Sequence, residues 1–405
     1  MKSKGRITLE NGLQIFYKKS PSKILSAVLE VGAGSCREPS NARGLAHLVE
    51  HVGFNGTRRY RTIRALMNAA ADYGFIPNAS TSFKYVKYPY DAFVQDIAPA
   101  TAIVADIAFA PLINEASVKK EKKIVLHEYV RSQDSSSFHE NKLFNKVFFH
   151  GTPAKILVIG IPAHIYALQA STVRDFHSNY CVPANSRLFI IGAIEENTLR
   201  NLGKILEQYP GGNPATQMTM SLRPLLNTEH HEEKTSFLRQ SYGCIAFRTP
   251  CFATPDEPAI AYINSLLAGR GKSSLLEIIR EQRHLAYATG SQLFDDTEIG
   301  YLAPYFECAS GKLEICRELT LHAISTLNPD EREIAAIRKS FEKSVASDQN
   351  NPVKQFNAFI NEELYGIHLG PYNKRLLAVS KKDILNARDK YLRGPYQSMV
   401  LVGSK

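Results

Sequence analysis

Apolar residues in the first 210 positions follow two periods, one typical of strands and one typical of helices. Short runs rich in β-branched and aromatic residues predict strands at residues 5–9, 13–18, 24–31 and 186–191, and a further strand near 80–88. Apolar residues at three- and four-residue spacing predict helices near 45–54, 63–73, 92–109 and 117–131. Between the first two strands, Asn11-Gly12 is a hairpin turn signal.

A break in this pattern predicts the domain organisation. Residues 209–214 contain consecutive glycines and two prolines, which stop any periodic element. We therefore expect a domain at 1–210, a linker at 211–222 and a second domain at 223–405. The second part again shows a strand at 243–248, helices at 258–267 and up to 282, and a strand at 301–308. This order predicts an α+β fold with two similar domains, each a mostly antiparallel sheet covered by helices.

Length and composition agree with a folded, soluble protein. A chain of 405 residues exceeds one ordinary hydrophobic core, and 44% hydrophobic with 22% charged residues is typical of globular domains. The apolar runs are strand-sized, far below the roughly 20 residues of a membrane helix. The sequence starts without an apolar signal region, and its six cysteines are scattered. We expect a cytoplasmic protein with free thiols and no membrane partner.

The net charge of +10 is concentrated in the first half of the chain. Residues 1–210 hold 26 Lys and Arg against 17 Asp and Glu, which leaves 23 against 22 for the remainder. The densest basic groups lie at 58–64 and 119–123. No helix-turn-helix, RNA-binding or zinc-finger pattern accompanies them. We therefore interpret them as solvated helix faces and expect no nucleic-acid partner.

The predicted helix at 45–54 carries the clearest candidate chemistry. His47 and His51 are four residues apart and share one helix face, so both imidazoles can reach one metal ion. Glu50 projects beside them, where a base can take a proton from an attacking water. The order His-x-x-Glu-His is a metallopeptidase motif. Two histidines buried in a core are the alternative, and a catalytic zinc needs a third ligand.

At this point the chain resembles the pitrilysin, insulin-degrading enzyme and mitochondrial processing peptidase family of inverted-zincin peptidases. Residues 9–13 match the family's opening hairpin, and residues 44–57 match its zinc-helix block. The family places a glutamate ligand about 76 residues downstream and a second glutamate seven positions before it. Glu128 and Glu121 stand at these positions. The resemblance implies a Zn²⁺ bound by His47, His51 and Glu128, with Glu121 beside it; without it, both glutamates would be surface charges.

The resemblance also implies residues that contact substrate. Asn78, Ala79 and Thr81 match a strand edge that pairs with the backbone of an extended peptide, although an ordinary turn before a strand has the same residues. Arg280 and Tyr287 match an Arg and a Tyr seven apart that bind substrate carbonyls or the developing oxyanion. Their alternative is a surface cation and a half-buried aromatic residue.

The function implied is a zinc-dependent endopeptidase in which Glu50 is the base and Glu121, Arg280 and Tyr287 assist. Relatives of this length resemble half of a clamshell that closes around peptides. We therefore expect a peptide substrate and a second subunit, either another copy or a related chain. The alternative is a non-catalytic structural or scaffold subunit of a paired peptidase complex.

Overall fold

The structure is a computed structural model that describes residues 2–216, 218–220, 222, 225–269, 271–348 and 351–403. The chain divides into two compact units, unit 1 (Met1–Ser132 and Ile156–Met218) and unit 2 (Gln133–Lys155 and Thr219–Lys405). This division differs from the predicted one because residues 133–155, expected in the first domain, belong to unit 2. Of the expected linker 211–222, Gln217 and Ser221 lie outside the described residues.

Unit 1 contains a six-stranded sheet in the order β1-β2-β6-β3-β5-β4. β2 pairs with β6 in parallel, and the other neighbouring strands are antiparallel. In β3, alternate residues Leu25, Ala27, Leu29 and Val31 are buried in the core, as the two-residue period of a strand requires. The strands are β1 (Lys4–Thr8), β2 (Gln14–Lys19), β3 (Ile24–Val31), β4 (Ser80–Thr81), β5 (Val86–Phe93) and β6 (Ser186–Gly192).

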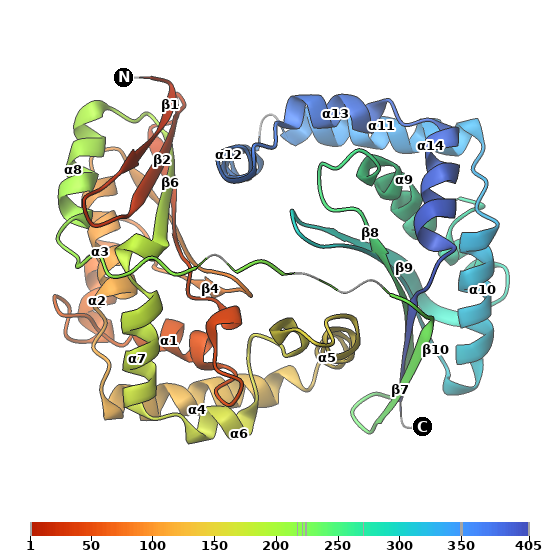
Figure 1. Cartoon of the computed structure of the whole chain (residues 1–405), viewed down its shortest axis with the longest axis horizontal. Helices are drawn as coiled ribbons and strands as arrows, with labels where there is room; N and C mark the ends of the chain where they lie inside the picture. Colours follow the sequence, from red (N-terminus) through yellow and green to blue (C-terminus); the bar gives the residue numbers. More distant parts are fainter. Residues whose placement is uncertain are drawn as a thin grey trace. The chain divides into compact units, whose positions relative to one another are not determined.

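Helices pack against one face of this sheet, where Figure 1 shows α3 and α8 side by side. The helical segments of unit 1 are η1 (Ser35–Arg37), α1 (Leu45–Gly53), α2 (Ile63–Ala71), α3 (Ile97–Phe109), α4 (Glu115–Ser132), α6 (Pro162–Ala167), α7 (Ala170–Tyr180), η3 (Pro183–Asn185) and α8 (Glu196–Leu206). The predicted helices at 45–54, 63–73 and 117–131 correspond to α1, α2 and α4.

Two predicted elements of unit 1 are wrong at their boundaries. The strand expected at 80–88 is two strands, because the backbone N–H and hydroxyl of Ser82 both donate to the Tyr85 carbonyl and close a turn. The helix expected at 92–109 begins only at Ile97, because Ala92 and Phe93 still pair with β3. Backbone pairing with a neighbouring strand therefore overrides the local helical pattern.

Unit 2 contains a five-stranded sheet in the order β7-β11-β8-β10-β9, with β7 and β11 parallel and the rest antiparallel. Its strands are β7 (Glu229–Thr235), β8 (Ser241–Thr249), β9 (Ala286–Asp295), β10 (Gly300–Cys308) and β11 (Gln397–Gly403). Its helical segments are α5 (Ser136–Phe148), η2 (Pro153–Lys155), α9 (Glu257–Ala268), the π-helical turn η4 (Leu276–Glu281), η5 (Ser310–Lys312), α10 (Leu313–Ser325), α11 (Glu331–Asp348), α12 (Pro352–Tyr365), α13 (Leu369–Leu377), α14 (Lys381–Ala387) and the π-helical turn η6 (Arg388–Leu392).

The two faces of this sheet are covered by different parts of the chain. Leu302 of β10 is buried in a core with Ile260 and Ile263 of α9. The preceding residue, Tyr301, faces the opposite way and makes an edge-to-face contact with Phe148 of α5, with ring centroids 5.0 Å apart. Figure 1 shows α9 and α10 on one face and α5 on the other. This aromatic packing is the reason why 133–155 belongs to unit 2.

The two sheets have the same strand order once β1 is set aside. The order β2-β6-β3-β5-β4 and the order β7-β11-β8-β10-β9 both place the last strand beside the first, in parallel, and then continue with the second, fourth and third. This confirms the predicted α+β fold of two similar, mostly antiparallel sheets with helices.

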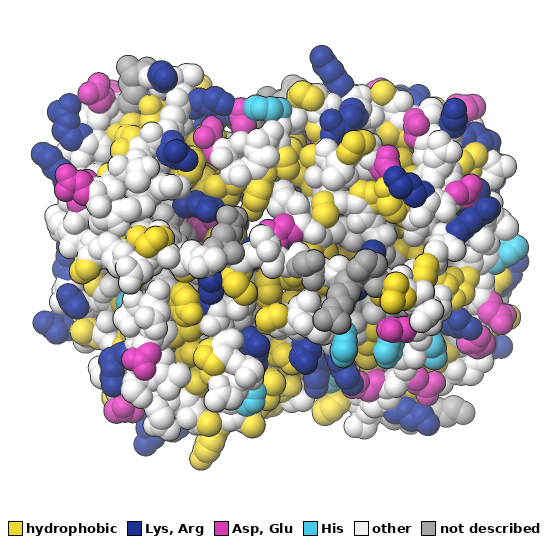
Figure 2. Space-filling view, in the orientation of Figure 1, with side chains coloured by type: hydrophobic (Ala, Val, Ile, Leu, Met, Phe, Trp, Pro, Cys, Tyr) yellow, Lys and Arg dark blue, Asp and Glu magenta, His cyan; other side chains and the backbone are white. Residues whose placement is uncertain are grey.

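Several basic residues of unit 1 have partners within the fold. Arg59 lies 3.3 Å from the Asp106 carboxylate, and Lys122 donates to the Leu168 carbonyl at 2.8 Å. On the face drawn in Figure 2, Lys and Arg side chains are dispersed among acidic and uncharged ones. Within the described part of the chain, no helix combines the length and the apolar character needed to cross a membrane.

A buried carboxyl group joins three elements of unit 2. Glu257, in the first turn of α9, is fully buried and accepts a hydrogen bond from Tyr372 of α13 at 3.2 Å. Burial, and then the adjacent carboxyl of Asp295 in β9, raise the pKa of Glu257 to about 8. Glu257 therefore keeps its proton at neutral pH.

This group should make the stability of unit 2 fall with rising pH. An unfolded glutamate titrates near 4.5, so between this value and about 8 the folded chain holds a proton that the unfolded chain releases. The contribution is complete below about pH 4.5, declines as the pH rises, and is lost once the pH passes about 8. Between about pH 5 and about pH 9, the free energy of unfolding, measured with urea, should therefore fall less with rising pH in Glu257→Gln than in the wild type. A pH dependence identical to that of wild type and of the exposed control Glu331→Gln would contradict this.

Candidate functional site

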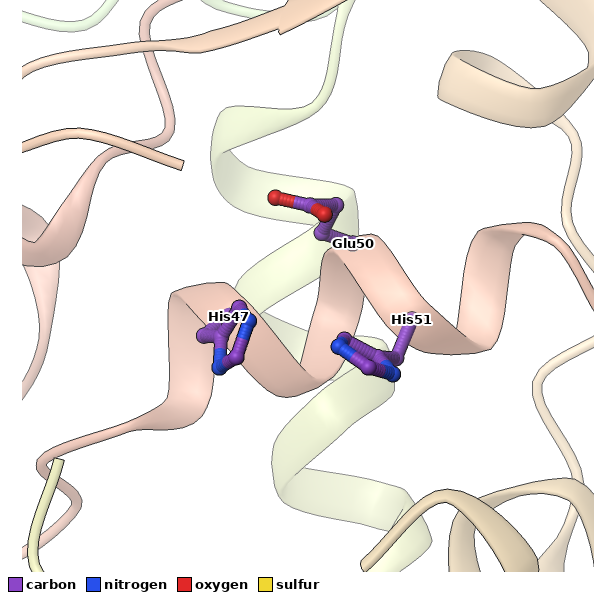
Figure 3. Close-up of side chains that lie close together, drawn as sticks. All are labelled: His47, Glu50 and His51. Atoms are coloured by element: carbon purple, nitrogen blue, oxygen red, sulfur yellow. The ribbon is translucent and has the colours of Figure 1, made fainter. Parts of the chain in front are cut away.

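Helix α1 packs its apolar face against the core, and this packing leaves its two histidines on another face. Its apolar residues Leu45, Leu48, Val49 and Val52 are buried, at the spacing of one helix face. His47 and His51 therefore lie together on the adjoining face, and Glu50 projects beside them (Figure 3). The ligand atoms of these three residues all lie within 4.8 Å of one another, the one such group of His, Cys, Asp and Glu among the described residues.

Helix α4 brings the two predicted glutamates to α1. Val118, Glu121 and Val125 are the buried residues of α4, so the stripe that packs inward contains a carboxylate. Glu128 continues this stripe one turn later, with its side chain 42% exposed. Since α1 packs against α4, the carboxylates meet the histidines. The predicted spacing thus corresponds to a real contact between the two helices.

The distances suit a tetrahedral zinc ion. Glu128 Oε2 lies 3.5 Å from His51 Nε2 and 3.9 Å from His47 Nε2. Two ligands that are each about 2.1 Å from a tetrahedral zinc are about 3.4 Å apart. Two imidazoles and one carboxylate form one of the ligand sets that hold catalytic zinc, with a fourth position open. These three residues could therefore hold the metal.

Glu121 orients His51 for this role. Its Oε2 lies 3.2 Å from Nδ1 of His51, which directs the other ring nitrogen, Nε2, toward Glu128. Burial lowers the pKa of His51, but the hydrogen bond to Glu121 and the charge of Glu128 outweigh it, so the net shift is upward. Burial also raises the pKa of Glu121, but its bonds from His51 and Asn55 outweigh this effect and lower it. Both partners therefore favour the charged form.

His47 has a different environment. Burial, assisted by the nearby His51, lowers the pKa of His47 to about 4. Its Nδ1 is buried and lacks a hydrogen-bond partner in the described part of the molecule. His47 is therefore a neutral imidazole at neutral pH, the form that binds a metal ion without first losing a proton.

Glu50 is a buried carboxylate held by Thr81. Only 8% of Glu50 is exposed, and burial raises its pKa, while the hydrogen bond from the Thr81 hydroxyl to Oε2 opposes the rise. A carboxylate with a raised pKa is suited to accept and return a proton near neutral pH. The sequence predicted Thr81 as a substrate contact and did not predict this bond.

The other two residues of the predicted strand edge lie beside Thr81. Asn78 is exposed, and its side-chain oxygen accepts from the Ala79 N–H at 2.9 Å. Ala79 is half-buried against the core. β4 is the last strand of the sheet and pairs only with β5 over Ser80 and Thr81 among the described strands, so one side of β4 is an open edge. Pairing with a peptide backbone at this edge stays a prediction.

Arg280 and Tyr287 belong to unit 2. Arg280 is exposed in the turn η4 and lies 3.6 Å from Glu281. Tyr287 is the second residue of β9, and 69% of it is exposed. Both side chains are accessible to a ligand, and their role in substrate binding stays a prediction.

Two residues of the site were missed by the sequence. Asn55 donates to Glu121 Oε1 at 2.6 Å, and Lys120 donates to Asn55 Oδ1 at 2.7 Å. Asn55 stands four positions after His51 and continues the line of His47 and His51, a spacing that could have identified it.

Comparisons with known proteins identify the family of the chain. Residues 14–158 match the family Insulinase (Peptidase family M16), and residues 167–341 match the Peptidase M16 inactive domain. The "Uncharacterized zinc protease YmxG" of Bacillus subtilis (strain 168) is 23% identical over 326 residues, which cover 80% of this chain and 78% of that protein. Subunit 1 of the mitochondrial cytochrome b-c1 complex of Bos taurus is 24% identical over 317 residues, 74% of this chain and 64% of that protein.

Solved structures show the same fold. The crystal structure of a protease from Helicobacter pylori superposes with a TM-score of 0.83 at 17% identity, covering 99% of this chain and 100% of that chain. The two family matches together extend over most of the chain, and related proteins align with most of its length. The chain belongs to peptidase family M16.

Proposed function

We propose that this chain is a zinc-dependent endopeptidase that hydrolyses peptides or small unfolded polypeptides. The observation that carries the proposal is the convergence of His47, His51 and Glu128 at zinc-ligand distances, with Glu50 beside them. Relatives named zinc proteases support the metal. The three ligands would hold Zn²⁺, which when bound polarises a substrate carbonyl and lowers the pKa of water.

The residues of the chain then have separate roles. Glu50 accepts a proton from the attacking water and delivers it to the leaving amine, as general base and then general acid. Thr81 holds the Glu50 carboxylate by its hydroxyl hydrogen bond. Glu121 fixes the ring of His51. Asn78 and Ala79 beside the open edge of β4 pair with the substrate backbone, and Arg280 and Tyr287 stabilise the oxyanion.

We also propose that catalysis takes place inside a closed chamber formed with a second subunit. Among the described residues, one group of side chains could hold a metal ion, and it lies on unit 1, whereas Arg280 and Tyr287 belong to unit 2. A homodimer would therefore contain every residue that the mechanism uses, and a heterodimer with a related chain is the other arrangement.

A non-catalytic scaffold subunit is the second candidate function. It is favoured by the similarity to subunit 1 of the cytochrome b-c1 complex of Bos taurus and of Homo sapiens. Against it stands the intact set of His47, Glu50, His51 and Glu128 in contact geometry. We therefore prefer the peptidase.

Metal binding tests the ligand assignment. The purified chain should retain one zinc per chain after dialysis, and His51→Gln should weaken zinc binding by more than about 100-fold, beyond the usual effect of an outer-shell residue. His127→Gln is the matched control, because His127 is exposed and precedes Glu128 on α4. Absence of zinc from the wild type, or equal losses in both variants, would contradict the site and favour the scaffold.

Peptide hydrolysis tests the base. Glu50→Gln should lower kcat by about 10² to 10⁴ while leaving zinc bound, since an amide cannot accept the proton. Glu115→Gln, an exposed change in the first turn of α4, should keep wild-type activity. Full turnover by Glu50→Gln in a zinc-replete sample free of contaminating peptidase would refute the role of Glu50.

The oligomeric state tests the chamber. Light scattering of the purified chain, with peptidase activity measured on the same fractions, should show activity only in a fraction of at least two chains. An active symmetric dimer would exclude an obligate second kind of subunit. Activity confined to monomer would contradict the proposed chamber.

A further inference from the structure

The chain turns sharply after α1 and directs Asn55 back toward α4. Helix α1 ends at Gly53, and the Asn55 N–H donates to the Val52 carbonyl at 3.1 Å. Gly56 follows with φ of 144°, and a Cβ there would lie 2.8 Å from the Arg61 carbonyl oxygen, so this turn requires glycine. Asn55 is therefore held at one position relative to His51, whose carbonyl its Nδ2 approaches at 3.4 Å.

The side chain of Asn55 connects Lys120 with Glu121. Its Nδ2 donates to Glu121 Oε1 at 2.6 Å, and its Oδ1 accepts from Lys120 Nζ at 2.7 Å. A lysine ammonium only donates hydrogen bonds, so Lys120 must face the oxygen of the amide. This fixes the amide orientation and leaves the NH₂ group toward Glu121. Lys120 Nζ also lies 3.5 Å from Glu121 Oε1.

Glu121 therefore has both oxygens engaged. Oε1 is bound by Asn55, and Oε2 lies 3.2 Å from His51 Nδ1. A carboxylate held at one oxygen cannot rotate away from the imidazole at its other oxygen. Whenever His51 is neutral, as a metal ligand must be, this position of Glu121 favours the proton on Nδ1 and leaves the lone pair on Nε2, which faces Glu128.

We propose that Asn55 and Lys120 are positioning residues for the metal centre, which act through Glu121 on the orientation and basicity of His51. The proposal rests on the proposed zinc site and adds to it two residues outside the ligand set. Neither residue would be a ligand of the ion: Lys120 orients the Asn55 amide, Asn55 orients the Glu121 carboxylate, and Glu121 orients His51.

A purely structural role for Asn55 makes a different prediction. If the side chain only fills the turn after α1, an aspartate of the same shape should replace it without effect. If it donates to Glu121, aspartate removes the donor and places a second negative charge beside Oε1, so the geometry around His51 should be disturbed. Asn55→Asp therefore separates shape from hydrogen bonding.

The experiment measures the zinc dissociation constant of the full chain by competition with a chelator, together with thermal unfolding of the zinc-free chain. Asn55→Ala and Asn55→Asp should each weaken zinc binding by about 10-fold or more, the usual effect of an outer-shell partner. Lys120→Met should weaken it by about twofold to fivefold, because Lys120 is half exposed. Adding Lys120→Met to Asn55→Ala should weaken zinc binding by a smaller factor than Lys120→Met does in the wild-type chain, because Lys120 acts through Asn55.

The controls are Asn68→Asp on α2 and Lys119→Met on α4, both exposed, which should bind zinc as the wild type does. If Asn55→Ala destabilises the zinc-free chain, the shape-conserving Asn55→Asp and the exposed Lys120→Met decide the question. Wild-type zinc affinity in those two variants would overturn this proposal and leave the zinc site intact. A wild-type chain that binds no zinc would overturn both.

Discussion

The contact between His51 of α1 and Glu121 of α4 is the interaction on which the site depends. It joins α1 to α4, and only 17% of the His51 side chain and 6% of the Glu121 side chain are exposed to solvent. A buried carboxylate is stabilised only where donors satisfy its oxygens, and here His51 and Asn55 do so. The same contact sets the distance between the two helices and turns the Nε2 atom of His51 toward Glu128. The proposed chemistry of Glu50 requires that arrangement.

The relative positions of these residues could be predicted in part from the sequence, because the residues lie on regular helices. A four-residue spacing places His47 and His51 on one face, and a seven-residue spacing places Glu121 and Glu128 on another, whatever the tertiary structure. That the two faces meet was an inference from resemblance, and the structure brings them to within 4 Å. Asn55 and Lys120 could not be predicted in the same way, since their contacts depend on a turn at Gly56 and on an amide orientation that only the folded chain defines.

The errors in the predicted fold have a common cause, which is that long-range packing overrides local pattern. The segment that contains β4 and β5 looks like one strand, but the bonds of Ser82 to Tyr85 divide it. Helix α5 lies within the predicted first domain in sequence, yet its ring contacts with Tyr301 place it in unit 2. Turn bonds and aromatic contacts with distant strands leave no periodic signal in the sequence.

The two units share a strand order but differ in the residues on their helices. Both units use the same arrangement of a parallel pair followed by antiparallel strands. In unit 1 the first long helix turns two histidines away from the core, whereas in unit 2 helix α9 buries Ile260, Tyr262 and Ile263 and has no histidine. The same strand order therefore carries a candidate metal site in unit 1, and unit 2 has no such site among the described residues.

The most direct test of this account is the position of zinc in crystals of the wild-type chain, measured by anomalous diffraction at the zinc edge. The account predicts one peak per chain at about 2.0–2.2 Å from His47 Nε2, His51 Nε2 and Glu128 Oε2. A peak at other residues, or no peak in crystals of zinc-replete protein, would contradict it.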